Sequence, residues 1–439
     1  MRLLFIAVGM AAAVGWAGYV LGQPKSSPAA PPPPPAQAAA AGAEAQISLG
    51  RYLVAVGDCI ACHTPKGGAR FSGGRPLETP FGVVLSANLT PDADTGIGRY
   101  TPDTFYRALH EGIDRQGRHL YPAFPYNYYT RVSRADSDAI FAYLRTLAPV
   151  RHELERNRLP FPFNIRALMA VWNLMFLDKG PYREDASRPA NWNRGAYLVE
   201  GLGHCQACHT PKNFLGAPKD GQAFEGGKFA EWFAPDLTPN RRRGIGSWND
   251  DDLRGFLRRG LNAHSAAAAE MGEVVAFSTS QWTDADVDAA VAYLRSIRAS
   301  SDDEVAAPDP AVMKQGEAIW QDACAACHRM DGSGVPGYFP PLVHDANVQQ
   351  RDPTTPLHYV LGGARREPTD RAPTPLAMPA FHWKLDDRQV AAVATYVRNS
   401  WGNRASPVEP EQVDRLRRKL ALSAKTPASG AGPASIDRH

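Results

Sequence analysis

The pattern of apolar and polar positions predicts a series of short helices, and three of them have starts that can be read directly. Ser133-x-x-Asp136 and Thr283-x-x-Asp286 have the capping-box spacing, and each precedes an Ala-rich apolar run that ends in Tyr-Leu. Asp386-x-x-Gln389 opens a third such run, which ends in Tyr-Val. The stretches before these helices are long and rich in Gly and Pro, so we expect loops there.

An uncharged apolar stretch, Leu3–Leu21, follows Met1-Arg2 at the N-terminus. It is longer than the apolar part of most signal peptides and close to the ~20 residues that span a bilayer. Residues 24–43 combine prolines, including Pro31–Pro35, with an Ala-rich run, which predicts a stiff extended spacer. We therefore expect residues 1–22 to be an uncleaved membrane anchor with Arg2 cytoplasmic, and 23–43 a linker. A cleaved signal peptide is the alternative, and in both cases the folded part is exported to the periplasm.

An internal repeat divides the middle of the chain. Gly50–Val54 matches Gly195–Val199, and Asn88–Pro91 matches Asp236–Pro239 at an offset of 148 residues. Two homologous domains are the simplest explanation. A leading helix, a loop-rich middle and a closing helix recur a third time, which predicts domains at 44–185, 186–305 and 306–405 and a C-terminal tail at 406–439.

Composition narrows the class of protein. The 439 residues include 48 Lys and Arg against 45 Asp and Glu, a net charge of +3 that gives no reason to expect nucleic-acid binding. The 38 Gly and 38 Pro argue against long coiled coils and large helical bundles.

The six cysteines carry the chemistry, because all of them lie in C-x-x-C-H motifs. Two cysteines three positions apart lie on one face of a helical turn, where both thiols can bond to one porphyrin, and the following His can bind its iron. The sequence therefore predicts three covalently bound haem c groups and an all-α fold of three tandem cytochrome c-type domains behind the anchor or signal and the Pro-rich linker. The attachment cysteines are Cys59, Cys62, Cys205, Cys208, Cys324 and Cys327, and the proximal ligands are His63, His209 and His328.

Two other uses of paired cysteines compete with haem attachment. Structural zinc takes four ligands from neighbouring pairs, whereas these pairs lie more than a hundred residues apart. A redox-active dithiol has no need of a His after the second Cys in all three motifs. We therefore favour haem for all three.

The second iron ligand in c-type haem proteins is commonly Met, and the chain has only eight. Position in the chain leaves Met169, Met175, Met271 and Met378 as candidates. Met378 lies in a Pro-bounded loop just before the last of the three closing helices, and Met271 lies in the corresponding loop of the second domain. We expect these two to be the distal ligands of the third and second haems.

The first domain departs from this pattern, because Phe124 stands where the ligand is expected and cannot bind iron. Met169 is our favoured replacement, with Ile165, Leu168 and Trp172 forming an apolar wall against water. Met175, His119 and an open position are the alternatives.

The motifs resemble those of the triheme cytochrome c subunits of bacterial membrane-bound dehydrogenases, over residues 45–403. The specific marks are the segments 194–199, 203–211, 378–381 and 398–403. The resemblance implies a catalytic partner that oxidises a substrate in the periplasm, which is a molybdenum hydroxylase, quinoprotein or flavoprotein, together with a small iron-sulfur or accessory subunit. It also implies ubiquinone or a terminal oxidase as electron acceptor. Residues 161–166 and Phe124 look more like the branch that serves molybdenum hydroxylases.

Two classes of function follow. The chain is either an electron-transfer subunit, or a peroxidase-like haem enzyme in which the first haem keeps an open coordination site. No nucleotide fingerprint such as G-x-G-x-x-G after a strand is found in the sequence, which favours electron transfer.

Overall fold

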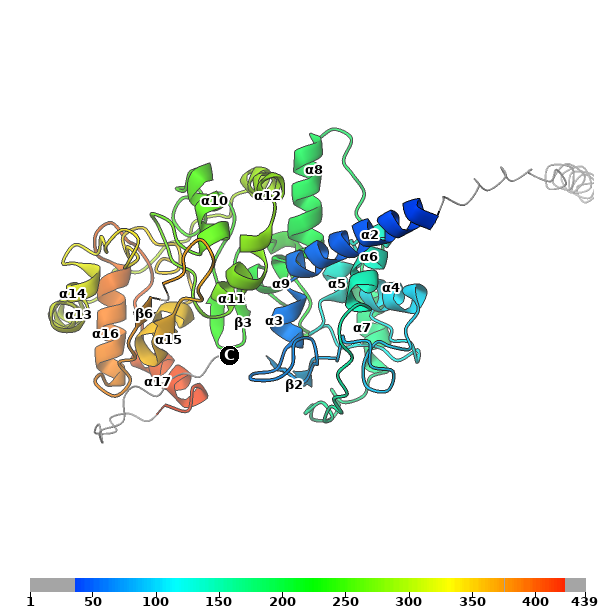
Figure 1. The fold of residues 1–439 in the computed structure, drawn as a ribbon. Helices are drawn as coiled ribbons and strands as arrows, with labels where there is room; N and C mark the ends of the chain where they lie inside the picture. Colours follow the sequence, from blue (N-terminus) through cyan, green and yellow to red (C-terminus); the bar gives the residue numbers. More distant parts are fainter. Residues whose placement is uncertain (1–35, 375, 423–439) are drawn as a thin grey trace, which may run out of the picture. The chain divides into compact units, whose positions relative to one another are not determined.

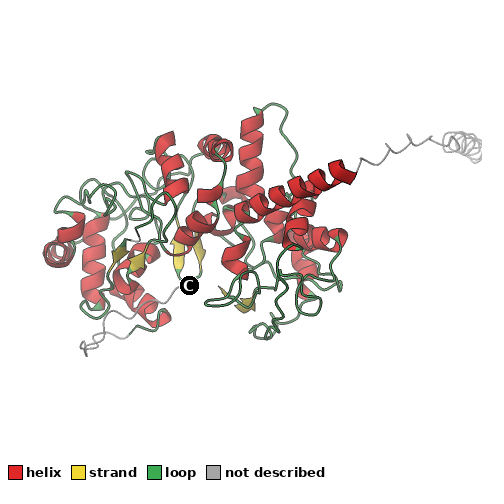
Figure 2. Ribbon diagram, in the orientation of Figure 1, coloured by secondary structure: helices red, strands yellow, loops and turns green. Residues whose placement is uncertain are grey.

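The computed structural model describes residues 36–374 and 376–422, which are mostly helical (Figures 1 and 2). Within the described residues, those up to Ala45 and those from Gln46 on belong to two separate units. The predicted anchor lies outside the described residues, and no helix within the described ranges is long and apolar enough to cross a membrane. The expected extended spacer is wrong from Ala36 on, where helix α2 begins. Alanine, which dominates that run, has the highest helix propensity of any residue.

The elements follow the expected order of leading helix, motif, loops and closing helix. Around the first motif they are α2 (Ala36–Val56), α3 (Cys59–His63), β1 (Pro76–Thr79), β2 (Gly82–Leu85), α4 (Pro102–Glu111), α5 (Tyr126–Tyr129), α6 (Arg134–Leu144) and α7 (Leu168–Phe176). Around the second they are α8 (Ala190–Ala196), the π-helical η1 (Tyr197–Leu202), α9 (Gln206–His209), η2 (Asp220–Gln222), β3 (Gly227–Phe229), β4 (Trp232–Ala234), α10 (Asp250–Arg259), α11 (Ala269–Phe277), η3 (Thr279–Gln281) and α12 (Asp284–Ser296). Around the third they are α13 (Pro310–Ala323), α14 (Ala325–His328), α15 (Thr354–Gly362), β5 (Ala364–Arg365), β6 (Ala377–Met378), α16 (Asp387–Arg398) and α17 (Pro410–Lys419).

Each leading helix crosses its closing helix at a glycine. A Cβ atom on Gly50 would lie 1.9 Å from the carbonyl oxygen of Ala139 in α6. Equivalent Cβ atoms on Gly195 and Gly316 would lie 2.0 and 2.3 Å from carbonyl oxygens in α12 and α16. Only glycine allows the backbones to approach this closely, so one helix crossing is built three times from the same residue type.

Two hydrophobic cores form around these crossings. One contiguous core combines the first and second motif regions and includes Leu53, Leu144, Leu198 and Leu294. A separate core surrounds Trp320 in the third region, and its members Val413 and Leu416 come from α17. The segment interpreted as a C-terminal tail thus contributes a buried helix, which packs on α16.

The loop-rich middles contain three short antiparallel ladders in addition to the expected helices. Strand β1 pairs with β2, β3 with β4, and β5 with β6 (Figure 2). Each has only two strands, and the fold remains mostly helical.

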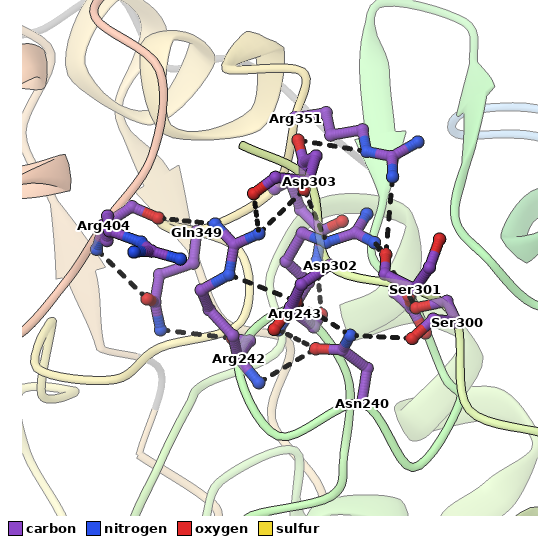
Figure 3. Close-up of polar contacts among 12 residues, drawn as sticks. Asn240, Arg242, Arg243, Ser300, Ser301, Asp302, Asp303, Gln349, Arg351 and Arg404 are labelled. Carbon is purple, nitrogen blue, oxygen red and sulfur yellow. Dashed lines mark hydrogen bonds and ion pairs between the residues drawn. The ribbon is translucent and has the colours of Figure 1, made fainter. Parts of the chain in front are cut away.

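A partly buried polar network joins the second and third regions through the connection at residues 300–304 (Figure 3). The carboxylate of Asp303 forms an ion pair with Arg242 at 2.7 Å and another with Arg351 at 3.2 Å. Arg242 also donates to the backbone carbonyl of Arg404 at 2.7 Å, and Gln349 donates to the carbonyl of Arg242. Contacts from three separated stretches therefore converge on one residue, Arg242, through its guanidinium and its backbone carbonyl.

Candidate haem sites

The three C-x-x-C-H motifs lie on short helical turns, and their histidines share one hydrogen-bonding arrangement. Nδ1 of His63 lies 2.6 Å from the carbonyl oxygen of Ala87, Nδ1 of His209 lies 2.7 Å from that of Pro235, and Nδ1 of His328 lies 3.1 Å from that of Pro340. A carbonyl can only accept, so Nδ1 carries the proton and donates it.

This arrangement leaves Nε2 of each imidazole with a lone pair, which is what an iron ligand requires. Burial lowers the pKa of all three histidines and keeps them neutral. The residues of each motif therefore fit a c-type haem, with two thiols for attachment and one oriented imidazole for iron.

The loops after the first and second motifs repeat the same backbone geometry. The amide of Phe71 donates to Oγ1 of Thr64, and the amide of Phe224 donates to Oγ1 of Thr210. Both phenylalanines are buried at positive φ, 62° and 64°, a strained conformation for a bulky residue that both loops retain. The two loops share this hydrogen bond although they differ in length, because Phe71 lies 7 residues after Thr64 and Phe224 lies 14 residues after Thr210.

The first cysteines of the first two motifs, Cys59 and Cys205, are not poised for thiolate chemistry. Burial raises the pKa of Cys59 and of Cys205 to about 12. A reactive dithiol requires a lowered thiol pKa, so the redox-active alternative finds no support at these sites.

Met271 and Phe124 lie at the same sequence distance from a shared hydrogen bond, but Met271 is in the first turn of α11 and not in the expected loop, whereas Phe124 lies in a turn before α5. The amide of Leu120 donates to the carbonyl of Gly112, and the amide of Ala267 donates to that of Gly260, both at 2.7 Å. Phe124 lies four residues after Leu120, and Met271 lies four residues after Ala267. The two regions therefore share the hydrogen bond that precedes these residues, but not the backbone conformation at the residues themselves.

Met378 lies half-buried in β6, paired with Ala364 of β5. The ladder follows Gly363, whose φ of 72° turns the chain out of α15. The loop is closed on its other side by the amide of Phe381, which donates to the carbonyl of Val360 in α15. Met378 is thus held on short, hydrogen-bonded backbone rather than on a free loop.

The candidates for the first site differ in their burial and in their surroundings. Met169 is half-buried and packs on a small cluster around Tyr126. Phe124 packs on the same cluster and also on the larger core of the first two regions, against which Cys59 packs as well. Met175 is 53% exposed, and Nδ1 of His119 is buried without a hydrogen-bond partner.

The expected apolar wall around Met169 is wrong in part. Trp172 is buried, but Ile165 and Leu168 are 40% and 42% exposed. These two side chains point to solvent because Trp172 and Asn173 define the face of α7 that packs on the protein.

Two aromatic residues that the sequence analysis does not identify, Tyr129 and His204, lie between the first and second motifs and make contacts next to both. The hydroxyl of Tyr129 donates to the carbonyl of Gly57, two residues before Cys59, and its ring lies 5.3 Å from that of His204, the neighbour of Cys205. Burial lowers the pKa of His204 to about 4. The only feature of the sequence that could have pointed to this contact is the position of His204 directly before the second motif.

Comparison with known proteins adds independent findings. The cytochrome c family model matches residues 193–298 and 313–401. The chain is 42% identical over 369 residues to a nicotinate dehydrogenase subunit of Pseudomonas putida, a match that covers 81% of this chain and 30% of that protein. It is 39% identical over 406 residues to the gluconate 2-dehydrogenase cytochrome c subunit of Pantoea cypripedii, covering 87% of this chain and 91% of the relative. It is 37% identical over 403 residues to the fructose dehydrogenase cytochrome subunit of Gluconobacter japonicus, covering 84% and 82%.

Proposed function

Because this chain belongs to the cytochrome c subunits of dehydrogenase complexes, we propose that it carries three haem c groups and passes electrons from a catalytic dehydrogenase subunit to ubiquinone or a terminal oxidase. The observation that carries the proposal is the shared fixing of His63, His209 and His328 by backbone carbonyls. The iron of a bound haem c takes up and releases single electrons. Three tandem domains, with boundaries as predicted from the repeat, would each hold one haem.

The protein side chains have distinct roles in this proposal. The cysteine pairs attach each haem, and the three histidines bind iron on the proximal side. We assign Met271 and Met378 as distal ligands of the second and third haems, since a soft thioether favours ferrous iron and raises the potential. For the first haem we assign Met169, which lies beside Phe124.

A haem assay on the purified chain tests the count directly. We expect three covalently bound c-type haems per chain, and two when Cys324 and Cys327 are both replaced by Ser. Fewer than three in the unchanged protein, with zinc accounting for the difference, would contradict the proposal.

The electron-transfer role requires a second measurement on the complex. Adding the substrate of a co-purified catalytic subunit should reduce the haems of this chain, and adding a ubiquinone analogue should reoxidise them. Haems that stay oxidised while the catalytic subunit turns over with an artificial acceptor would remove this chain from the electron path.

The haem-enzyme alternative rests on Phe124, which places no ligand at the usual position. Rapid binding of carbon monoxide to the reduced, unmodified protein would show an open site at one haem and favour that alternative.

We further propose that the body of the protein is periplasmic and held by Leu3–Leu21 as an anchor. The native protein should remain with membranes after a high-salt wash. Recovery of a mature chain that begins near Ala38 would show cleavage instead.

A further inference from the structure

A row of apolar side chains is exposed along α7 and the segment before it. Its members are Phe161, Phe163, Ile165, Leu168, Val171 and Leu174, which we call the α7 patch. Phe161 is 78% exposed and Leu174 is 87% exposed, and nothing in the described parts of the chain covers them. Soluble proteins rarely leave so many neighbouring large apolar side chains in water, and such patches mark interaction sites.

The helix that carries the patch is firmly held by its opposite face. The indole nitrogen of Trp172 donates to the carbonyl of Leu215 at 3.0 Å. The amide oxygen of Asn173 accepts from the hydroxyl of Tyr126 at 2.6 Å, and its nitrogen donates to the carbonyl of Glu111. The exposure of Leu168, Val171 and Leu174, spaced three residues apart, is therefore a property of a fixed helix face and not of a frayed end.

Phenylalanines from the rest of the first and second regions adjoin this face. The ring centroids of Phe163 and Phe81 lie 4.9 Å apart. The ring of Phe81 also packs next to Gly216, where a Cβ atom would lie only 3.0 Å from it. Phe214, next to the residue that accepts from Trp172, is 87% exposed. The most exposed side chains thus stand out from the surface instead of lining a groove.

The charged side chains inside the segment that carries the patch are all arginines, while Glu155 and Asp178 directly border that segment. From Arg156 to Leu177 the chain contains Arg156, Arg158 and Arg166 and no Asp or Glu. The guanidinium of Arg166 is held over the ring of Tyr121, 4.8 Å from its centroid, and donates to the carbonyl of His119. Protruding Phe and Leu side chains flanked by arginine are typical of surfaces that enter the interface of an anionic bilayer.

The predicted anchor makes such a contact reachable. If residues 1–22 are held in a membrane, residues 23–35, even fully extended at ~3.1 Å per residue, keep the start of α2 within about 40 Å of that membrane. We propose that the α7 patch inserts into the headgroup region of an anionic lipid membrane and is a second membrane contact, built into the folded body and separate from the N-terminal segment.

A site-specific probe separates this contact from the anchor. In the full haem-loaded chain, whose native cysteines are consumed by haem, Leu174→Cys is labelled with the fluorophore NBD, and Tyr338→Cys serves as the matched control. Tyr338 is also well exposed, at 61%, and lies in the third region. The labelled chains are reconstituted into vesicles of phosphatidylcholine with phosphatidylglycerol.

We expect the label at position 174 to shift its emission to shorter wavelength and to lose at least about threefold in quenching by aqueous iodide, because it enters the lipid interface. The label at 338 should stay fully quenchable. Replacing Arg158 and Arg166 by Gln in the Leu174→Cys background should reduce the shift, as should vesicles of phosphatidylcholine alone.

Equal iodide quenching at positions 174 and 338 in anionic vesicles would overturn the proposal. Protection of position 174 only after the catalytic subunit is added would also overturn it, because the patch would then be a protein interface. Neither outcome bears on haem content or electron transfer, which the haem assay and substrate-driven reduction test independently.

Discussion

The hydroxyl of Tyr52 donates a 2.5 Å hydrogen bond to the carboxylate of Asp286, which lies 234 positions away at the start of α12. The repeat supplies the reverse contact, because the hydroxyl of Tyr197 donates to the carboxylate of Asp136 at the start of α6. Each leading helix thus contacts the closing helix of the other region. This exchange explains why the first and second regions share one core while the third has its own.

The exchange predicts that the two tyrosines stabilise the paired regions. Tyr52→Phe and Tyr197→Phe should each lower the free energy of unfolding by about 1–3 kcal/mol, because a hydrogen bond to a charged, largely buried carboxylate is lost. Denaturant unfolding of the full chain measures the effect, and Tyr338→Phe at an exposed site is the control. Two variants as stable as the control would show that the contacts contribute nothing.

The capping pattern shows what the sequence could and could not predict. The side chains of Ser133 and Thr283 do cap their helices, as expected from the spacing. The carboxylates of Asp136 and Asp286 do not complete a capping box, however, because they accept from tyrosines of the other region. In the third region Asp386 and Gln389 form the full box. Local spacing therefore predicted where the helices begin, but not a bond that exists only after two repeats have paired.

Other features could be read from the sequence but were missed. Gly316 has the role of Gly50 and Gly195, and its match at the third crossing was not identified. Helix α17 begins with Pro410 at its first turn and a capping box between Glu409 and Gln412, which is a strong helix signal. The exposure of one face of α7 could not be predicted from the sequence. An apolar helix has the same sequence pattern whether one or both of its faces are covered by the rest of the protein.

The glycine crossings predict a clear difference between equivalent substitutions. Gly316→Ala should destabilise the third region by about 1–3 kcal/mol or more, because the added methyl would overlap the carbonyl of Ala392 and force the helices apart. Gly42→Ala in α2 meets no atom within 4 Å and should be neutral or slightly stabilising. Thermal unfolding followed by circular dichroism distinguishes the two. Equal midpoints would argue against a tight crossing at Gly316.

The network at residue 303 predicts a dependence of stability on pH. Burial raises the pKa of Asp303, but Arg243, Arg351 and Arg242 outweigh it and hold that pKa below the ordinary value. Because the pKa of Asp303 is lower in the folded than in the unfolded state, its carboxylate stabilises the fold fully at pH values above the unfolded-state pKa of about 3.9. This stabilisation is lost as the pH falls through the folded-state pKa.

Asp303→Asn should therefore cost about 1–2 kcal/mol of unfolding free energy at neutral pH, and the difference from the unchanged protein should shrink as pH falls below about 4. Glu153→Gln, at an exposed ion pair with Arg151, should change stability by less than about 0.5 kcal/mol at any pH. A cost for Asp303→Asn that does not vary with pH would show that its charge is not what holds the second and third regions together.

The distal assignments predict spectroscopic changes at two haems. Met271→Ala and Met378→Ala should each convert one haem from six- to five-coordinate or water-ligated and lower its potential, because the thioether that stabilises ferrous iron is removed. Redox titration of the full chain with optical detection measures both effects. Potentials unchanged in both variants would mean that Met271 and Met378 are not the distal ligands.

The matching positions of Phe124 and Met271 after the shared hydrogen bond give the first haem a test by loss and gain. Met169→Leu keeps size and apolarity, so disappearance of one Met-to-iron charge-transfer band would report lost ligation and not unfolding. Adding Phe124→Met to that variant should restore the band, because methionine then stands at the same distance from the shared hydrogen bond as Met271 does in the second region. An unchanged spectrum in Met169→Leu would transfer the assignment to His119 or Met175. If carbon monoxide also binds rapidly to the reduced protein, the position is open, and Phe124→Met alone should then both create the band and block the binding.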